Sequence, residues 1–317
     1  MKHPGRIIVY EVGNMALRKY FFYVVGNDRA NEHVANSFVL YYEYFLQLHY
    51  LRKVSLFLKL LKFNMAKTVV VHSDFKALGS QLQEAISGFD ANIDFVTKGE
   101  RNVIKKVSIG DSVFTIKRFK EPGIFNALVY QFLRKSKAKR SFEYAIRLID
   151  LGINTPRPVA YFERFSFGLK DSYYISEHIA YDLDFRVLNH NPEYPNRDEI
   201  LQQVAAFTFK LHENNVNFLD HSPGNTLIKV SGEGQFDFYL IDLNRMRFEP
   251  MDLDARMKNF RRLWLSKRMI NVMAAAYAQL SGHSQSKIHE LMTKYSRQFQ
   301  KKVNSKKIRK RKKNKLH

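Results

Sequence analysis

The pattern of hydrophobic and polar positions divides the chain into a strand-rich first part and a helical second part. Short β-branched and aromatic runs with period-two alternation predict strands at residues 93–97, 103–109, 112–119, 159–164 and 172–178, and residues 69–72 form a further strand-like run. Turn residues at 98–100 and at Gly110-Asp111 separate the first three of these strands. A short helix is expected at residues 75–87, before them.

Amphipathic periodicity predicts a helix over residues 134–150, within the strand-rich part, and then a helical second part. Residues 197–213 carry apolar residues on one face and two acids in the first turn, as expected of a helix. Residues 253–266, 268–280 and 286–299 also favour helices. The boundary between a mostly β first lobe and a mostly helical second lobe falls after Ile179, before a loop rich in Asp, Asn and Pro.

Residues 219–243, which stand between two of these helices in the sequence, predict a β-hairpin with candidate catalytic and metal-binding residues at its open end. Its strands are residues 226–230 and 236–241, with a glycine-containing loop between them. Neighbouring strands lie about 5 Å apart, so Asn225 and Asp242, which flank the hairpin, can ligate one hard cation. Asp220 stands across a tight turn from Asn225 as a carboxylate able to accept a proton. These residue types together indicate phosphoryl transfer.

Two charged residues in the first part complete this set. Lys117 lies in the third strand, on the same face as Val113 and Thr115 if the strand alternates. Glu143 lies beside the apolar stripe of the helix at 134–150. The functional interpretation pairs Lys117 with Glu143 to orient nucleotide phosphates. The alternatives are a solvent-facing strand lysine and an exposed pair of Glu143 with Arg147 at i+4 spacing.

The ordered set resembles the lipopolysaccharide core kinases, the Kdo and heptose kinase family within the protein-kinase-like fold. The resemblance is carried by SKAKRSFEYAIRLIDLGINTPRPVAYFE, FLDHSPGNTLI and FYLIDLNRMRF, within about residues 90–270. It implies an α+β fold of two lobes, with an antiparallel β-sheet N-lobe that has one main helix and a mostly helical C-lobe. The expected domains are an N-terminal extension at 1–64, an N-lobe at 65–179, a C-lobe at 180–300 and a basic disordered tail at 301–317.

The resemblance also assigns roles. Lys117 is similar to the phosphate-orienting lysine, with Glu143 as its partner, and Asp220 corresponds to the catalytic base. Asn225 and Asp242 correspond to Mg²⁺ ligands. The remaining two ATP-binding positions are at the adenine hinge, where backbone groups are expected to make the contacts: Glu177 and Ile179.

The implied activity is ATP-dependent phosphorylation of a sugar hydroxyl, Kdo in the leading interpretation, on the lipid A–core glycolipid. The chain departs from regulated protein kinases, because Phe218 and Leu219 stand where His and Arg would precede the catalytic Asp. Leu243 and Asn244 follow Asp242 in place of Phe-Gly, and no glycine-rich loop precedes Lys117. These departures favour a small-molecule or glycolipid acceptor, and they leave impaired nucleotide binding open.

The charge of the chain is concentrated at its ends. The formal net charge is +22, and residues 301–317 carry +10 and residues 1–64 carry +5 of it, which leaves +7 for the middle. This asymmetry indicates a polyanionic partner, and a lipid surface bearing the anionic glycolipid is expected. A solvated tail is the alternative. The basic cluster at residues 134–140 is either a solvated face or a cradle for phosphate groups.

Neither a membrane-spanning helix nor a signal peptide is expected in the first 64 residues. The most apolar stretch, residues 37–63, is interrupted by five charged side chains. One alternative makes Met65 the true initiator after an over-extended gene model, and the other places a basic amphipathic segment, residues 48–63, on a membrane surface. Together with the absence of cysteine, this predicts that the chain stays on the cytoplasmic side. The resemblance implies that it works at the cytoplasmic face of the inner membrane, and the basic tail is expected to associate it with that membrane peripherally.

Three alternatives to this function remain. One is a kinase for another acceptor, such as a small sugar, an aminoglycoside or a protein. The second is a non-catalytic pseudokinase scaffold that binds anionic glycolipid, although retention of all five charged or amide site residues disfavours it. The third, nucleic-acid binding, rests only on the basic tail and is not expected. The acceptor hydroxyl, the residues that bind the acceptor and the oligomeric state are not specified by the sequence.

Overall fold

The computed structural model describes residues 7–11, 20–24, 66–91, 95–98 and 102–314. Contacts along the chain divide it into two units, Met1–Asn64 and Met65–His317, at the boundary expected for an N-terminal extension. In the first unit, β1 (Ile7–Glu11) pairs antiparallel with β2 (Tyr20–Val24). The predicted amphipathic segment at 48–63 lies outside the described residues.

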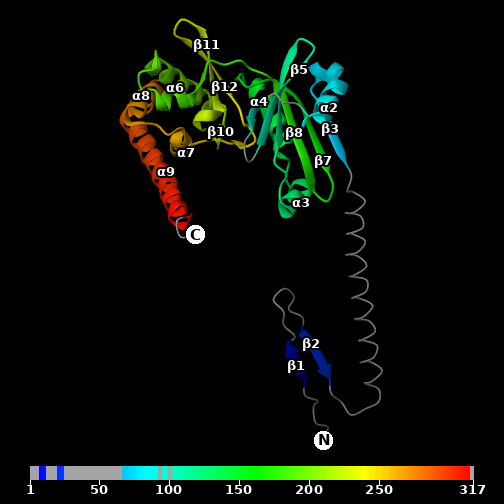
Figure 1. Cartoon of the computed structure of the whole chain (residues 1–317). Coiled ribbons are helices and arrows are strands. Elements are labelled where there is room, and N and C mark those ends of the chain that lie inside the picture. Colours follow the sequence, from blue (N-terminus) through cyan, green and yellow to red (C-terminus); the bar gives the residue numbers. More distant parts are fainter. Residues whose placement is uncertain (1–6, 12–19, 25–65, 92–94, 99–101, 315–317) are drawn as a thin grey trace. The chain divides into compact units, whose positions relative to one another are not determined.

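The second unit begins with a six-stranded antiparallel sheet in the order β3-β7-β8-β6-β5-β4. Its strands are β3 (Lys67–Val71), β4 (Phe95–Lys98), β5 (Asn102–Ile109), β6 (Ser112–Phe119), β7 (Pro158–Phe165) and β8 (Leu169–Glu177). Each predicted strand therefore forms, with boundaries shifted by a few residues. We call this part the sheet lobe (Figure 1).

Alternation along β6 gives the sheet two different faces. Phe114 and Ile116 are buried against η1 (Ser73–Leu78) and α2 (Gly79–Ser87). Phe119 points to the opposite face, where it joins Phe142 and Ala138 of α4 (Lys137–Asp150) in a second apolar cluster. Thr115 and Lys117 share this second face as predicted, and both line the cavity described below. The alternation thus directs Lys117 toward the helical part of the unit.

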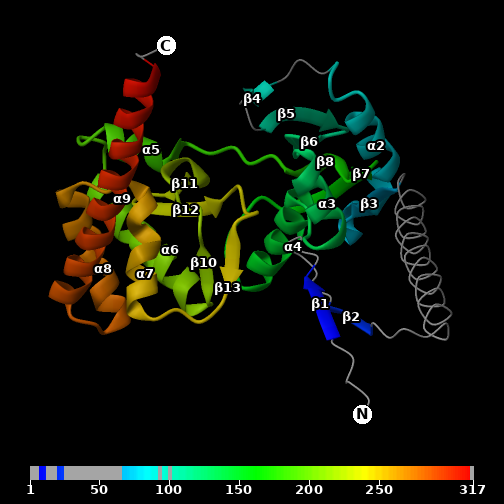
Figure 2. The same cartoon turned by 90° about the horizontal axis from the view of Figure 1, so that it is seen from below.

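The helical lobe packs three long helices around one apolar core. Ile200, Val204 and Leu201 of α6 (Arg197–Glu213) are buried with residues of α8 (Lys267–Ser281) and α9 (Gln285–Asn314). The predicted hairpin is β11 (Thr226–Gly232) and β12 (Gln235–Leu240), and β9 (Leu183–Asp184) extends it to three strands. Figure 2 shows the hairpin between the helices and the sheet lobe. The predicted division after Ile179 falls in the segment that connects β8 to β9.

Several elements differ from the expected pattern. The sequence reasoning did not predict α3 (Ile124–Phe132), α5 (Phe185–His190) or the antiparallel pair β10 (Val216–Phe218) and β13 (Met246–Phe248). The helix expected at 253–266 is α7 (Leu253–Asn259) followed by η3 (Phe260–Leu263). It ends at Trp264, whose φ of 60° is left-handed and cannot continue a helix.

The expected disordered tail is helical as far as the structure describes it. Residues 301–314 form the last turns of α9 and are almost entirely exposed. Ser284 and Gln285 begin a helix anchored by the buried side chains of Ile288 and Met292, so the basic residues continue a helix that the core has already nucleated. In the described part of the chain, no helix is long and apolar enough to cross a membrane.

Candidate active site

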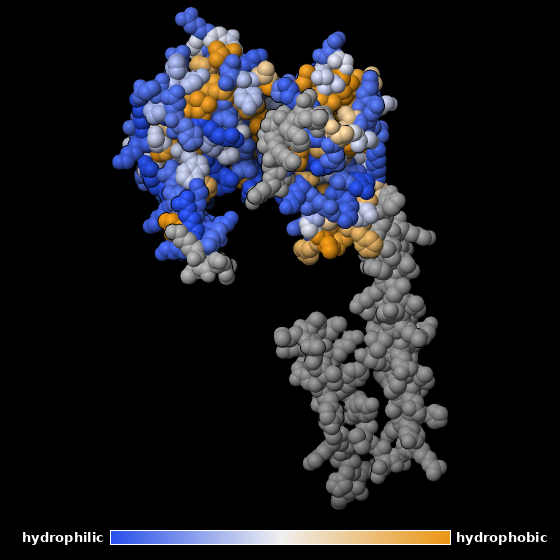
Figure 3. Space-filling model, in the orientation of Figure 1, coloured by the Kyte–Doolittle hydropathy of each residue, from blue (hydrophilic) through white to orange (hydrophobic). Residues whose placement is uncertain are grey.

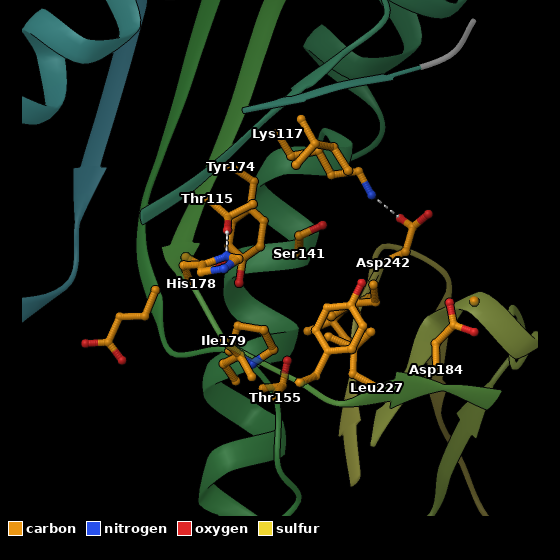
Figure 4. Close-up of a pocket in the computed structure, with 18 of the residues that line it drawn as sticks. Thr115, Lys117, Ser141, Thr155, Tyr174, His178, Ile179, Asp184, Leu227 and Asp242 are labelled. Carbon is orange, nitrogen blue, oxygen red and sulfur yellow. Dashed lines mark hydrogen bonds and ion pairs between the residues drawn. The ribbon is translucent and has the colours of Figure 1, made fainter. Parts of the chain in front are cut away.

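A cavity of about 220 Å³ lies between the sheet lobe and the hairpin (Figure 4). The sheet lobe contributes Thr115, Lys117 and Tyr174 to its wall, and α4 contributes Ser141. The helical lobe closes the other side with Leu227 of β11 and with Ile241 and Asp242 after β12. The cavity therefore contains side chains that lie far apart in the sequence.

The end of β8 forms one wall of the cavity. Glu177 and Ile179, the two positions expected at an adenine hinge, both line it. The backbone N–H of Glu177 donates to Arg157 O at 2.9 Å, and that of His178 donates to Val113 O at 2.8 Å. No hydrogen bond uses the N–H of Ile179 within the part of the chain that the structure describes. This donor is available to a hydrogen-bond acceptor in the cavity.

His178 holds the edge of this wall. Its Nδ1 lies 3.1 Å from Thr115 Oγ1, a contact drawn in Figure 4. Burial and then the charge of Lys106 lower the pKa of His178, so the ring is neutral at neutral pH. Its contact with Thr115 therefore links the end of β8 to β6 without adding a charge to the cavity wall. Sequence reasoning did not single out His178 or Thr115, because neither carries a charge that would mark it.

Lys117 reaches Asp242 across the cavity. Its Nζ lies 2.8 Å from Asp242 Oδ1, and the lysine side chain is 13% exposed. Asp242 has a φ of 58°, a left-handed conformation that few side-chain-bearing residues adopt. The amide of Asn244 donates to the same carboxylate. In this conformation the Asp242 carboxylate contacts Lys117.

Asn225 and Asp220 lie beside the cavity on the loop before β11. The Asn225 Nδ2 donates to the backbone O of Asp220 at 2.8 Å, and Ile241 N donates to Asn225 O at 3.0 Å. The second bond closes the open end of the hairpin and brings Asn225 next to the residue that precedes Asp242, and the first holds the Asn225 amide against the loop. Asp220 and Asn225 do not line the cavity themselves, although their neighbour Gly224 does.

Asp220 is surrounded by cations. Arg262 of η3 places Nη2 at 2.7 Å from Asp220 Oδ1, and Arg245 Nη1 lies 3.6 Å from Oδ2. Below this loop, His221 is fully buried and its Nδ1 lies 3.1 Å from Asn259 Oδ1. Burial lowers the pKa of His221 to about 4, so this residue is neutral and structural.

The predicted pairing of Lys117 with Glu143 is not formed. Glu143 Oε2 instead accepts from Lys135 Nζ at 2.7 Å, and Lys117 pairs with Asp242. The reason is the rotation of α4: Ser141 faces the cavity, and a residue two positions further points to the opposite side of a helix with 3.6 residues per turn. The alternative pair with Arg147 is also absent, because its guanidinium lies 3.9 Å from the ring centroid of Phe248.

The basic cluster at 134–140 does not present a single cationic face. Arg140 is buried and its Nε donates to Ser136 O, while Lys135 is engaged with Glu143. Sequence reasoning also missed Arg186, which lines the cavity next to Asp184. A Cβ on Gly224 would lie 1.9 Å from Arg186 Nη2, so the absence of a side chain at Gly224 lets this guanidinium lie over the loop.

The donor set at the hairpin fits Mg²⁺. Asp242 supplies a carboxylate and Asn225 an amide oxygen, and Mg²⁺ is commonly held by one or two protein ligands together with phosphates and water. No cluster of three or more His, Cys, Asp or Glu that could hold a metal occurs among the described residues.

Comparison with known proteins identifies this arrangement. The profile of the "Lipopolysaccharide kinase (Kdo/WaaP) family" matches residues 104–295, which includes Lys117, the hinge and the whole hairpin. The chain belongs to this family. It is therefore a sugar kinase of lipopolysaccharide core biosynthesis, a phosphotransferase with an alcohol acceptor that uses ATP. Among curated proteins, none matches the chain.

A solved structure supports the fold. The chain is similar to "WaaP in complex with acyl carrier protein", with a TM-score of 0.54 and 18% identity over 74% of this chain and 98% of that one. At this identity the likeness speaks for the fold alone. It confirms the α+β, protein-kinase-like, two-lobed architecture expected from the sequence.

Proposed function

We propose that this kinase transfers the γ-phosphoryl group of ATP to a hydroxyl of Kdo on the lipid A–core glycolipid. The observation that carries the proposal is the cleft in which Lys117 meets Asp242 while Asn225 and Asp220 stand on the adjoining loop. Kdo is named in the family description. It is the acceptor that best explains a cationic surround of the base, since Kdo carries a carboxylate.

Each residue of the proposed site has one task. Lys117 orients the α and β phosphates, and the backbone of Glu177 and Ile179 binds the adenine. Asn225 and Asp242 hold Mg²⁺, which when bound neutralises the charge developing on the phosphates. Glu143, paired with Lys135, acts on this site only from a distance, by fixing the start of α4.

The chemical step requires one proton acceptor. The acceptor hydroxyl oxygen forms a bond to the γ-phosphorus while the bond from that phosphorus to the β–γ bridging oxygen breaks. Asp220 takes the hydroxyl proton, and ADP leaves with the bond electrons on its β-phosphate. The loop fixes Asp220 through the bond from Asn225 to its backbone oxygen, so the carboxylate approaches the acceptor from a constant direction.

A transfer assay tests the proposal. The purified chain is incubated with labelled ATP, Mg²⁺ and Kdo-lipid A, with lipid A lacking Kdo as the matched acceptor, and Asp220→Ala reports any contaminating kinase. We expect label on Kdo-lipid A alone, removable with the Kdo sugar by mild acid. Label on the Kdo-free acceptor, or no label on either, would overturn Kdo as the acceptor.

We further propose that the enzyme works at the cytoplasmic face of the inner membrane, held by two elements. The exposed end of α9, residues 301–314, is about 21 Å long at 1.5 Å per residue, and nine of its 14 residues are Lys or Arg. The second element is α3 and the residue after it, with Ile124 at 83%, Phe125 at 80% and Leu133 at 82% exposure. Figure 3 shows α3 as an apolar patch at the same edge of the second unit as the end of α9.

Exposed apolar side chains and a cationic helix on one molecule suit an anionic bilayer. Exposed Ile, Phe and Leu gain free energy by entering the acyl boundary, and each basic residue near an anionic surface adds about 1 kcal/mol. Co-sedimentation with vesicles of anionic or zwitterionic lipid at low salt separates the two contributions. Deletion of residues 301–317 should abolish the preference for anionic vesicles, and Phe125→Ser with Leu133→Ser should weaken binding to both. Unchanged binding by either variant would contradict its role.

A further inference from the structure

Two guanidinium groups stand at the carboxylate proposed as the base. Arg262 Nη2 lies 2.7 Å from Asp220 Oδ1 and Arg245 Nη1 lies 3.6 Å from Oδ2. Two positive charges therefore face one negative charge. No other acidic side chain pairs with either arginine in the described part of the chain. The single charge of Asp220 therefore balances only one of the two arginines, and the surroundings of the proposed base keep a net positive charge.

Arg262 is held in place by the structure beneath it. It belongs to η3, whose Phe260 and Leu263 are fully buried in the helical lobe. Asn259, just before η3, donates to Phe218 O at 2.9 Å, which ties this segment to the strand that leads to Asp220. Arg262 therefore keeps its position when its carboxylate partner is drawn away.

The Arg262 side chain retains unused hydrogen-bonding capacity. Its guanidinium lies 5.6 Å from the ring centroid of Phe299 on α9, and its Nε is buried without a hydrogen-bond partner. The neighbouring Arg261 shows the same crowding of cations, because burial and then the charge of Arg262 lower its pKa.

Arg245 approaches from the other side with more freedom. Its side chain is 53% exposed, and its backbone oxygen accepts from Leu219 N at 3.0 Å, which fixes its Cα beside the catalytic loop. Neither Arg245 nor Arg262 lines the cavity assigned to the nucleotide. Both contact the carboxylate of Asp220, to which the acceptor must bring its hydroxyl.

We infer that Arg245 and Arg262 form an anion subsite that binds a carboxylate or phosphate group of the acceptor next to the hydroxyl that is phosphorylated. The inference rests on the proposed function, since it takes Asp220 as the base. Guanidinium forks match the two oxygens of a carboxylate or phosphate. An acceptor anion that engages Arg262 also releases Asp220 from its closest ion pair, so the base becomes available when the acceptor is bound.

Steady-state kinetics with paired acceptors test the subsite. Wild type, Arg262→Gln, Arg245→Gln and Arg262→Lys are compared on Kdo-lipid A, on its carboxyl-reduced form, and on a form lacking the lipid A phosphates. Arg247→Gln is the control, because Arg247 lies two positions from Arg245 but pairs with Glu249. Arg262→Lys keeps the charge without the fork and serves if Arg262→Gln fails to fold.

A charge-assisted hydrogen bond contributes about 1.5–3 kcal/mol, so we expect the KM for Kdo-lipid A to rise roughly 10- to 100-fold in Arg262→Gln, with the KM for ATP changed by less than about twofold. For wild type, the KM should rise by a similar factor on the acceptor that lacks the anion bound by the subsite. For Arg262→Gln, the KM on that acceptor should be no higher than its KM on Kdo-lipid A. If the carboxyl-reduced acceptor behaves in this way, the bound group is the carboxylate; if the acceptor without lipid A phosphates does, the bound group is a phosphate.

Two results would overturn the subsite. One is a rise in the KM for ATP in Arg262→Gln, which would assign the arginines to the γ-phosphate. The other is an equal loss on all three acceptors. If wild type transfers no phosphate to the unmodified acceptor, the proposed function itself fails. The reaction of wild type with unmodified Kdo-lipid A shows this separately from the comparison of variants.

Discussion

The two sides of the cleft hold their charged groups by different means. On the hairpin side, Asp220, Asn225 and Asp242 lie within one short stretch of chain, and backbone bonds from Leu219 and Ile241 lock that stretch together. On the sheet side, Lys117 and Glu143 come from β6 and α4, which contact each other only through packed side chains. The hairpin side forms as expected, whereas Lys117 and Glu143 do not meet.

The difference shows which kind of spacing carries geometric information. A turn of five residues closed by backbone hydrogen bonds admits few conformations, so the positions of Asp220 and Asn225 follow from their separation. A helix docked on a sheet can rotate about its axis, and a rotation of about 100° per residue decides which side chain faces the cleft. Here that side chain is Ser141.

Among the substitutions that distinguish the hairpin side of the cleft from the sheet side, the largest loss of activity is expected at Asp242. Asp242→Asn removes the charge that faces both Lys117 and the proposed Mg²⁺, and kcat should fall by about 10³-fold, as when a preorganised electrostatic group is lost. Measurement of kcat over a range of Mg²⁺ concentrations checks this. Asn225→Asp is the matched variant on the same hairpin and should retain activity, because a carboxylate can replace the amide oxygen. Equal loss in both would argue against their role as ligands.

The next effect concerns the buried histidine under the catalytic loop. Burial lowers the pKa of His221 to about 4 from an ordinary value of 6.5. Between pH 6.5 and about 4, His221 is protonated in the unfolded chain but neutral in the folded chain. The free energy of unfolding therefore falls as the pH drops through this range, by on the order of 3 kcal/mol. Urea unfolding at several pH values measures this loss. His221→Gln should reduce the slope over that window by about half, because burial lowers the pKa of His212 to about 3 and His212 contributes the rest; an unchanged slope would contradict the prediction.

A smaller effect is expected at Lys117. Lys117→Met should reduce kcat/KM for ATP by about 100-fold, since a preorganised charge that orients phosphates is removed while the hinge remains. Nucleotide titration of the variant, compared with Lys106→Met on the neighbouring strand, provides the measurement. Equal kinetics for Lys117→Met and wild type would show that the pair with Asp242 is only structural.

The smallest effect is expected at Glu143. Because its partner is Lys135, an exposed ion pair that contributes less than about 1 kcal/mol, Glu143→Gln should change kcat/KM by less than about fivefold. The same assay with Lys135→Gln is the control and should give a similar value. A loss comparable to that of Lys117→Met would show that Glu143 swings onto Lys117 when nucleotide binds.

The sequence predicted most of this architecture because its signals are local. Alternation marked the strands around Lys117, and glycine and proline marked the hairpin of residues 226–241. It missed α3, whose apolar residues are exposed and therefore show no period that separates a buried face from a solvent face. It also missed β10 and β13, since a pair of three-residue strands is specified by tertiary contact and not by pattern.

Among the site residues, the sequence located those on the hairpin and the hinge but not the arginines around Asp220. Arg262 stands 42 positions after Asp220, in a segment expected to continue as one helix. Only the left-handed turn at Trp264 and the break into η3 bring this guanidinium to the catalytic loop. A basic residue in an amphipathic helix gives no sign of such a partner.

The measurement that tests the account most directly compares Asp220→Ala and Glu143→Gln in one transfer assay with labelled ATP and Kdo-lipid A. The account predicts that Asp220→Ala loses about 10³-fold in rate, as expected for removal of a general base, while Glu143→Gln stays within about fivefold of wild type. Transfer that survives in Asp220→Ala, with the protein shown to be folded, would contradict the assignment of the base and with it the account of the hairpin as the catalytic side of the cleft.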